Sequence, residues 1–175
     1  MQSGKTDVLS LRIDENIRNL LDNECVEKEI AFNKLVTQIL TRHARWDKMA
    51  EKMDMITMPK TTFKEYISKI SDDDVKDVVK GTCLEVFKNY TLLNTGEFGI
   101  KTFLETLDLY FSINQISFEH ITTNDENHRY VIRHNIGPKF SIIFHEILSG
   151  IIEQLDWKYT SMNMTDQNLS FEIKK

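Results

Sequence analysis

The chain has 175 residues, of which 41% are hydrophobic and 28% charged, with only 6 Gly and 2 Pro, a composition typical of one or two folded domains. No apolar run approaches the roughly 18 residues of a membrane span, no signal-peptide core is present, and two isolated cysteines exclude a disulfide framework, so we expect a cytoplasmic protein. The net charge of −5 does not indicate a nucleic-acid binder, but residues 1–60 hold ten Lys/Arg and ten Asp/Glu and are therefore neutral.

Residues 7–13, DVLSLRI, alternate between two faces as a half-buried strand does. One face carries Val8, Ser10 and Arg12, and the other carries Leu9, Leu11 and Ile13. The next segment with strand character begins about a hundred residues downstream. The sequence therefore predicts a strand with no partner in its own neighbourhood.

Two helices are predicted after this strand. Asp14 is suited to cap a helix over residues 15–28, with Glu15 in its first turn. A second helix begins near Asn33 and its apolar side chains recur at steps of three and four as far as residue 55. Pro59 marks its latest possible end.

The rest of the chain changes from helices to strands. Helices are predicted from about residue 61, after the cap Ser71, over 99–113 and over 139–155. Strand patterns follow at 115–123, 128–136, 157–165 and 168–174, and the first two are joined by the turn-like TNDEN. We predict an α+β protein whose domains span residues 1–57 and 58–175, the second containing a four-stranded antiparallel sheet.

A strand followed by two helices over residues 6–45 resembles the ribbon-helix-helix DNA-binding family of the Arc/MetJ type. The resemblance implies that the strand pairs with the same strand of a second subunit, which also supplies the helical floor that an isolated ribbon needs. It implies a shared dimer core formed by Leu9, Leu11, Ile13, Ile17, Leu21, Leu35, Val36 and Ile39.

The same resemblance places the outward side chains in the major groove of double-stranded DNA. Arg12 would contact guanine, Ser10 other base edges and Val8 the methyl group of thymine, while Asn33 and Lys34 at the start of the second helix would hold a phosphate. The segment EIAFNK departs from the family, which usually has a Gly before this helix and a Ser or Thr at its cap.

Four histidines fall in residues 115–150, but no two have the spacing that places both imidazoles on one face for a metal ion. His120 and His134 share parity with the apolar residues of their strands and are expected to be half-buried structural groups. Glu105 and Asp108 are expected on a solvated helix face. Gly150 is expected to allow close packing of its helix on the sheet.

Residues 115–173 resemble vinyl-reductase-like and haem-NO-binding sensor modules, small α/β domains that hold ligands. No phosphate loop or nucleophile with a recognisable base is present, so we expect no enzyme, no catalytic residues, no metal and no cofactor.

The sequence thus predicts a homodimeric, sequence-specific transcriptional regulator with a C-terminal domain that senses a small molecule or mediates assembly. Three alternatives stay open: a metal-responsive regulator, an antitoxin-type DNA-binding protein, and an interaction module without DNA binding. A fourth alternative concerns the fold: residues 7–13 would form an edge strand of the C-terminal sheet.

Overall fold

The computed structural model describes residues 7–124 and 126–175, which divide into two compact units between Ala44 and Arg45. Residues 1–6 of the predicted first domain and residue 125 of the predicted turn lie outside the described residues. Residues 45–57, which we assigned to the first domain, make their contacts with the second unit. The division of DNA binding and ligand sensing or assembly between two domains stays a prediction.

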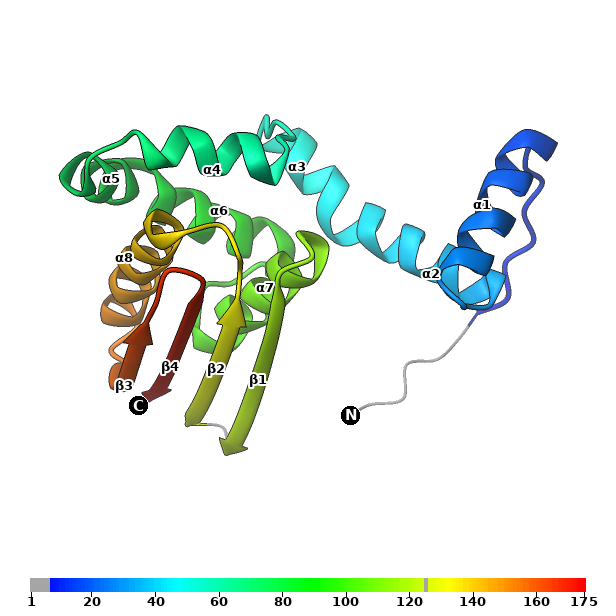
Figure 1. The fold of residues 1–175 in the computed structure, drawn as a ribbon. Helices are drawn as coiled ribbons and strands as arrows, with labels where there is room; N and C mark the ends of the chain where they lie inside the picture. Colours follow the sequence, from blue (N-terminus) through cyan, green and yellow to red (C-terminus); the bar gives the residue numbers. More distant parts are fainter. Residues whose placement is uncertain (1–6, 125) are drawn as a thin grey trace. The chain divides into compact units, whose positions relative to one another are not determined.

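The N-terminal unit contains helices α1 (Glu15–Glu27) and α2 (Phe32–Arg42), preceded by a coil over residues 7–14 (Figure 1). The predicted cap is confirmed, because the Asp14 carboxylate accepts a hydrogen bond of 2.8 Å from the backbone N–H of Asn16. The two helices pack through Arg18, whose guanidinium lies 3.7 Å from the centre of the Phe32 ring.

Within the described part of this single chain, residues 7–13 pair with no strand. The sheet of the second unit consists of four other strands, so the alternative that residues 7–13 form its edge is wrong. A strand needs hydrogen-bonding partners for its backbone. If the partner of residues 7–13 is a second chain, a single copy leaves this segment unpaired. The ribbon itself stays a prediction.

The predicted long second helix is found as a helical run over residues 32–52 with a change of type inside it. After α2 comes a π-helical turn, His43–Asp47, and then α3 (Lys48–Lys52). The extra residue in a π turn shifts the phase of the side chains that follow it.

The second unit continues with five helices among its described residues. They are α4 (Lys60–Ser68), α5 (Asp72–Val78), α6 (Leu84–Thr95), α7 (Ile100–Ile113) and α8 (Pro138–Gln154), with a second π-helical turn, Val79–Cys83, between α5 and α6. The starts of four of them agree with the sequence predictions, whereas the fifth, α6, was expected to be the continuation of the helix that Ser71 caps. Ser71 caps α5 as predicted, accepting at 3.1 Å from the backbone N–H of Asp74. Gly96 ends α6 in the left-handed conformation, at φ 81°.

The predicted four-stranded antiparallel sheet is confirmed, with the strand order β1-β2-β4-β3. Its strands are β1 (Ser117–Asn124), β2 (Asn127–Arg133), β3 (Lys158–Met164) and β4 (Asn168–Lys174). Both hairpins form as expected, and β2 pairs with β4 in the centre, where Tyr130 lies opposite Phe171.

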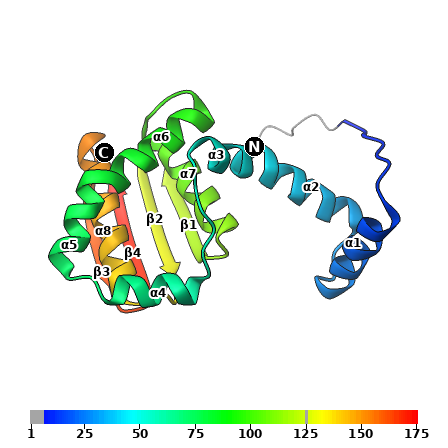
Figure 2. The same ribbon diagram turned by 90° about the horizontal axis from the view of Figure 1, so that it is seen from above.

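One face of this sheet is covered by helices and the other is exposed. Helix α7 packs on β1 and helix α8 on β3 and β4, while α4 and α5 pack on α8 and α6 on α7 (Figures 1 and 2). Arg129, Arg133 and Glu119 lie exposed on the uncovered face, as the alternation of an antiparallel sheet with one wet side requires.

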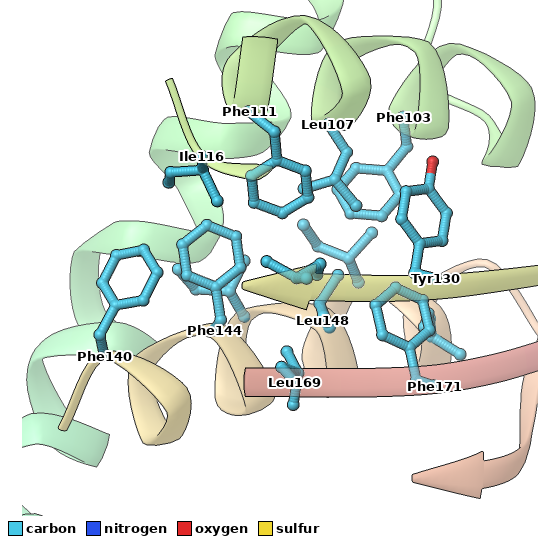
Figure 3. Close-up of a cluster of buried hydrophobic side chains, with 14 of the residues drawn as sticks. Phe103, Leu107, Phe111, Ile116, Tyr130, Phe140, Phe144, Leu148, Leu169 and Phe171 are labelled. Atoms are coloured by element: carbon cyan, nitrogen blue, oxygen red, sulfur yellow. The ribbon is translucent and has the colours of Figure 1, made fainter. Parts of the chain in front are cut away.

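The core lies between the sheet and helices α7 and α8, and it is rich in aromatic rings (Figure 3). Phe111 and Phe144 have ring centres 5.3 Å apart, and Tyr130 and Phe171 stack at 5.0 Å. Rings at such separations add to the free energy gained by burying their apolar area.

Gly150 of α8 allows a close approach, but to a different neighbour than we expected. A Cβ at this position would lie 2.8 Å from both terminal carbons of Leu84 in α6. Its close contact is therefore with a helix and not with the sheet.

Candidate nucleic-acid interface and ligand cavity

The predicted dimer core of the N-terminal unit is largely uncovered in the single chain. Exposed fractions are 65% for Leu9, 55% for Leu11, 43% for Ile13, 50% for Ile17 and 42% for Ile39. The other predicted members are less exposed: Leu21 and Val36 are half-buried and Leu35 is buried at 2%. Leu20 and Leu40, which we did not assign to the core, are also exposed at 64% and 47%. We call the seven exposed side chains, Leu9, Leu11, Ile13, Ile17, Leu20, Ile39 and Leu40, the N-terminal apolar row.

The predicted DNA-contacting residues are all exposed. Val8, Ser10 and Arg12 lie in the coil before α1, and Asn33 and Lys34 lie in the first turn of α2. The structure gives none of the five a role in packing the unit.

The start of α2 leaves its first N–H groups without a capping side chain. Its N-cap is Ala31, no side chain accepts a hydrogen bond there, and the first turn holds no acidic residue. Glu29, in the turn before this helix, has the left-handed φ of 52°, a conformation that Gly adopts more readily. An uncapped helix N-terminus favours an anion.

Residues 7–44 hold five Lys/Arg and seven Asp/Glu, so this part of the chain has no net positive charge, and four of the acidic side chains lie on α1. Two of them are paired within the helix, Asp22 with Arg18 at 2.8 Å and Glu24 with Lys28. The hydrogen bond to Asp22 is the main cause that raises the pKa of the exposed Arg18. Such exposed pairs contribute little stability, but they leave fewer basic groups for phosphates.

In the second unit a cavity of about 460 Å³ lies between α6, α7 and the chain around α3. We call it the aromatic cavity; its walls are Trp46, Met53, Asp54, Met55, Ile56, Val86, Phe87, Tyr90, Tyr110 and Asn114. Sequence reasoning missed it, because these residues come from three segments whose proximity depends on tertiary packing.

Aromatic rings organise one wall of the aromatic cavity. The Trp46 ring centre lies 5.1 Å from that of Tyr90 and 5.9 Å from that of Tyr110, and Tyr110 lies 5.3 Å from Phe87. Tyr90 donates a hydrogen bond of 3.0 Å to the backbone carbonyl of Arg45. Burial raises the pKa of both Tyr90 and Tyr110 to about 12, so both phenols are neutral near pH 7.

A polar chain crosses from α7 to the first hairpin. Tyr130 donates to Asp108 at 2.6 Å, and the Nδ1 of His120 lies 2.9 Å from the other oxygen of Asp108. The Nε2 of His120 lies 3.1 Å from the Nδ1 of His128. Burial, and then the charge of Asp108, raise the pKa of Tyr130 far above its usual value. Glu105 is exposed as we predicted, whereas Asp108 is half-buried, with 35% of its side chain exposed, because it faces Tyr130 and His120 of the hairpin.

Both histidines that we expected to be structural are held by hydrogen bonds. The side chain of His120 is only 16% exposed, and His134 is 2% exposed. His134 lies 2.8 Å from the hydroxyl of Ser141, and its Nδ1 accepts from the backbone N–H of Ile136 at 3.2 Å.

The described residues contain no group of three His, Cys, Asp or Glu side chains arranged to hold a metal ion. In the same part of the chain, no helix is long and apolar enough to cross a membrane.

No family model and no curated protein matches this chain. Among solved structures, a point mutant of the H-NOX protein from T. Tengcongensis has a TM-score of 0.45 at 9% identity, covering 79% of this chain and 93% of that one. A second structure, described as probing the function of heme distortion in the H-NOX family, has a TM-score of 0.34 at 11% identity and covers 78% and 89%. Both scores lie below 0.5, so neither assigns a family or an activity.

Proposed function

We propose that the chain is a homodimeric, sequence-specific DNA-binding regulator that reads DNA through residues 7–13. The observation that carries the proposal is the N-terminal apolar row, in which Leu9, Leu11 and Ile13 alternate with the outward-facing residues of the same segment. Burying one such side chain is worth about 1.5–3 kcal/mol, so seven partly exposed ones offer several kcal/mol per subunit.

In this proposal a second copy of the chain covers the N-terminal apolar row. Residues 7–13 carry a strand pattern that the four-stranded sheet of the same chain does not take up. An identical segment offers the same pattern in return, and a two-fold axis makes such a surface self-complementary. Pairing would satisfy the backbone of both copies and cover both apolar rows at once.

Pairing would also bring two sets of Val8, Ser10 and Arg12 to one outer face. A two-stranded ribbon fits the major groove, where an Arg can contact guanine by two hydrogen bonds. The uncapped start of α2, with the exposed Lys34, suits a backbone phosphate on either side of that ribbon. The second unit would then serve ligand sensing or further assembly.

The test compares two variants that the proposal assigns to different contacts. Sites are first selected from random duplex DNA with the full chain, and binding to a selected site and to random DNA is then titrated at two salt concentrations. Arg12→Ala should lower the specific-to-random ratio, with a loss of about 1–3 kcal/mol per base contact. Lys34→Ala should weaken both DNAs alike and reduce the salt dependence by about one unit per subunit.

Lys69→Ala is the matched control, because Lys69 is an exposed lysine of the second unit, 3.1 Å from Glu65, and it should leave both affinities unchanged. An unchanged ratio for Arg12→Ala would exclude residues 7–13 as the reading surface. A protein that dimerises but enriches no DNA site would instead be an interaction module without DNA binding.

A further inference from the structure

The aromatic cavity is a pocket open to solvent on one side, where Ile56 is exposed. Ligand cavities and clefts measure about 300–1,000 Å³. At about 460 Å³ the aromatic cavity lies within this range.

The chemistry of the lining restricts what can occupy the cavity. Eight of its ten residues are aromatic or aliphatic, and the two others are Asp54 and Asn114. The Asn114 amide already donates to the backbone carbonyl of Tyr110 at 2.9 Å. With no Lys, Arg or His among these ten residues, the lining offers nothing that would neutralise an anion. Its one charged side chain, Asp54, is exposed to solvent, so the rest of the lining with its flat rings suits a flat, uncharged molecule.

Two local features coincide at this cavity. Trp46 lies in the π-helical turn His43–Asp47, a type of turn often found at functional sites. Ile56 lines the cavity and yet is 83% exposed. A packed core alone requires neither of the two.

We propose that the aromatic cavity binds a neutral, flat, apolar molecule of two or three fused rings. An apolar cavity of about 150 Å³ in another protein holds one benzene ring, so about three times that volume suits this size. The ligand lies against Trp46, between α6 and the coil over residues 53–56. Binding at this site does not depend on the proposed DNA binding, because every lining residue belongs to the second unit.

The experiment uses 1-bromonaphthalene as the probe, because a bromine atom quenches tryptophan fluorescence only at contact. The full chain carries Trp157→Phe, which leaves Trp46 as its one tryptophan. We expect quenching that saturates with probe concentration. Quenching that rises in proportion to the probe without saturating would overturn the proposal.

Blocking variants separate the cavity from other apolar surfaces, above all the N-terminal apolar row. Val86→Phe fills the cavity from α6 and should weaken the saturable quenching by about tenfold or more. Val78→Phe is the matched control, since Val78 is 56% exposed at the end of α5 and does not line the cavity. It should bind the probe as the parent chain does.

Met55→Phe narrows the same cavity from the coil. It replaces Val86→Phe as the blocking variant if circular dichroism shows that Val86→Phe is unfolded. Equal quenching in a folded blocking variant and in Val78→Phe would overturn the proposal. So would saturable binding, seen by equilibrium dialysis, that leaves the Trp46 fluorescence unchanged, because the probe would then occupy another surface.

Discussion

The buried His134 should make the second unit lose stability as the pH falls below the pKa of free histidine. Its hydrogen bonds fix one neutral tautomer: Nδ1 accepts from the Ile136 N–H, so Nε2 carries the proton and donates to Ser141. Ser141 in turn donates to the backbone carbonyl of Thr165 at 2.7 Å. A second proton on the ring has no acceptor in this arrangement.

Burial lowers the pKa of His134 to about 4, from about 6.5 in the unfolded chain. Between these values the unfolded state binds more protons than the folded one. The contribution of the neutral His134 to the free energy of unfolding is therefore fully present above about pH 6.5, and it is lost as the pH falls toward 4. At pH 4.5 the loss amounts to about 2.5 kcal/mol, since one pKa unit corresponds to about 1.4 kcal/mol.

The assay is urea unfolding at pH 7.5 and pH 4.5, followed by tryptophan fluorescence at one protein concentration. Both tryptophans, Trp46 and Trp157, lie in the second unit, so the signal reports on that unit. His134→Gln keeps an N–H donor for Ser141 but cannot titrate, and it should reduce the difference in unfolding free energy between the two pH values by about 2.5 kcal/mol.

Ser141→Ala is the control, because it removes one hydrogen bond and leaves the titrating ring in place. It should lower stability at both pH values and keep most of the difference between them. If His134→Gln showed the same pH difference as the parent chain, the buried neutral ring would not be the cause.

Three further substitutions test particular contacts by the midpoint of unfolding. Tyr130→Phe removes the hydrogen bond to Asp108 and should destabilise the second unit by about 1–2 kcal/mol; an unchanged midpoint would show that the bond contributes nothing. Gly150→Ala should cost about 1–3 kcal/mol, and less in a Leu84→Ala background that removes the clashing carbons; equal losses in both backgrounds would contradict the close contact. Asp14→Ala should lower helix content at the N-terminus and cost about 1 kcal/mol, and a neutral effect would argue against the observed cap.

The sequence predicted the elements whose determinants are local. Ser71 and Asp14 mark their helices because a cap needs only the N–H groups two or three residues ahead. Alternation in residues 128–136 predicted that His134 lies on the same side as Tyr130 and Ile132, because successive side chains of a strand face opposite sides. His134 is more deeply buried than the half-buried state we expected.

The features that sequence reasoning missed depend on residues far apart in the chain. The hydrogen bonds of Asp108 to Tyr130 and His120 could not be predicted, because these residues meet only when α7 packs on the hairpin. The neighbour of Gly150 was misassigned for the same reason, since α6 and α8 meet only in the folded unit. The π-helical turn at Trp46 has no composition that distinguishes it from the helix around it, so the aromatic cavity could not be located.

The dimeric ribbon is the central claim, and contacts between two copies of residues 7–13 test it most directly. The measurement is isotope-filtered NMR on full-length protein that mixes labelled and unlabelled chains. An antiparallel pair centred on Ser10 predicts intermolecular contacts between the α protons of facing residues, for example between the two copies of Ser10 or between Leu9 of one chain and Leu11 of the other. A mixed sample that is fully exchanged and shows no intermolecular contact in residues 7–13 would contradict the ribbon and the DNA-reading surface built on it.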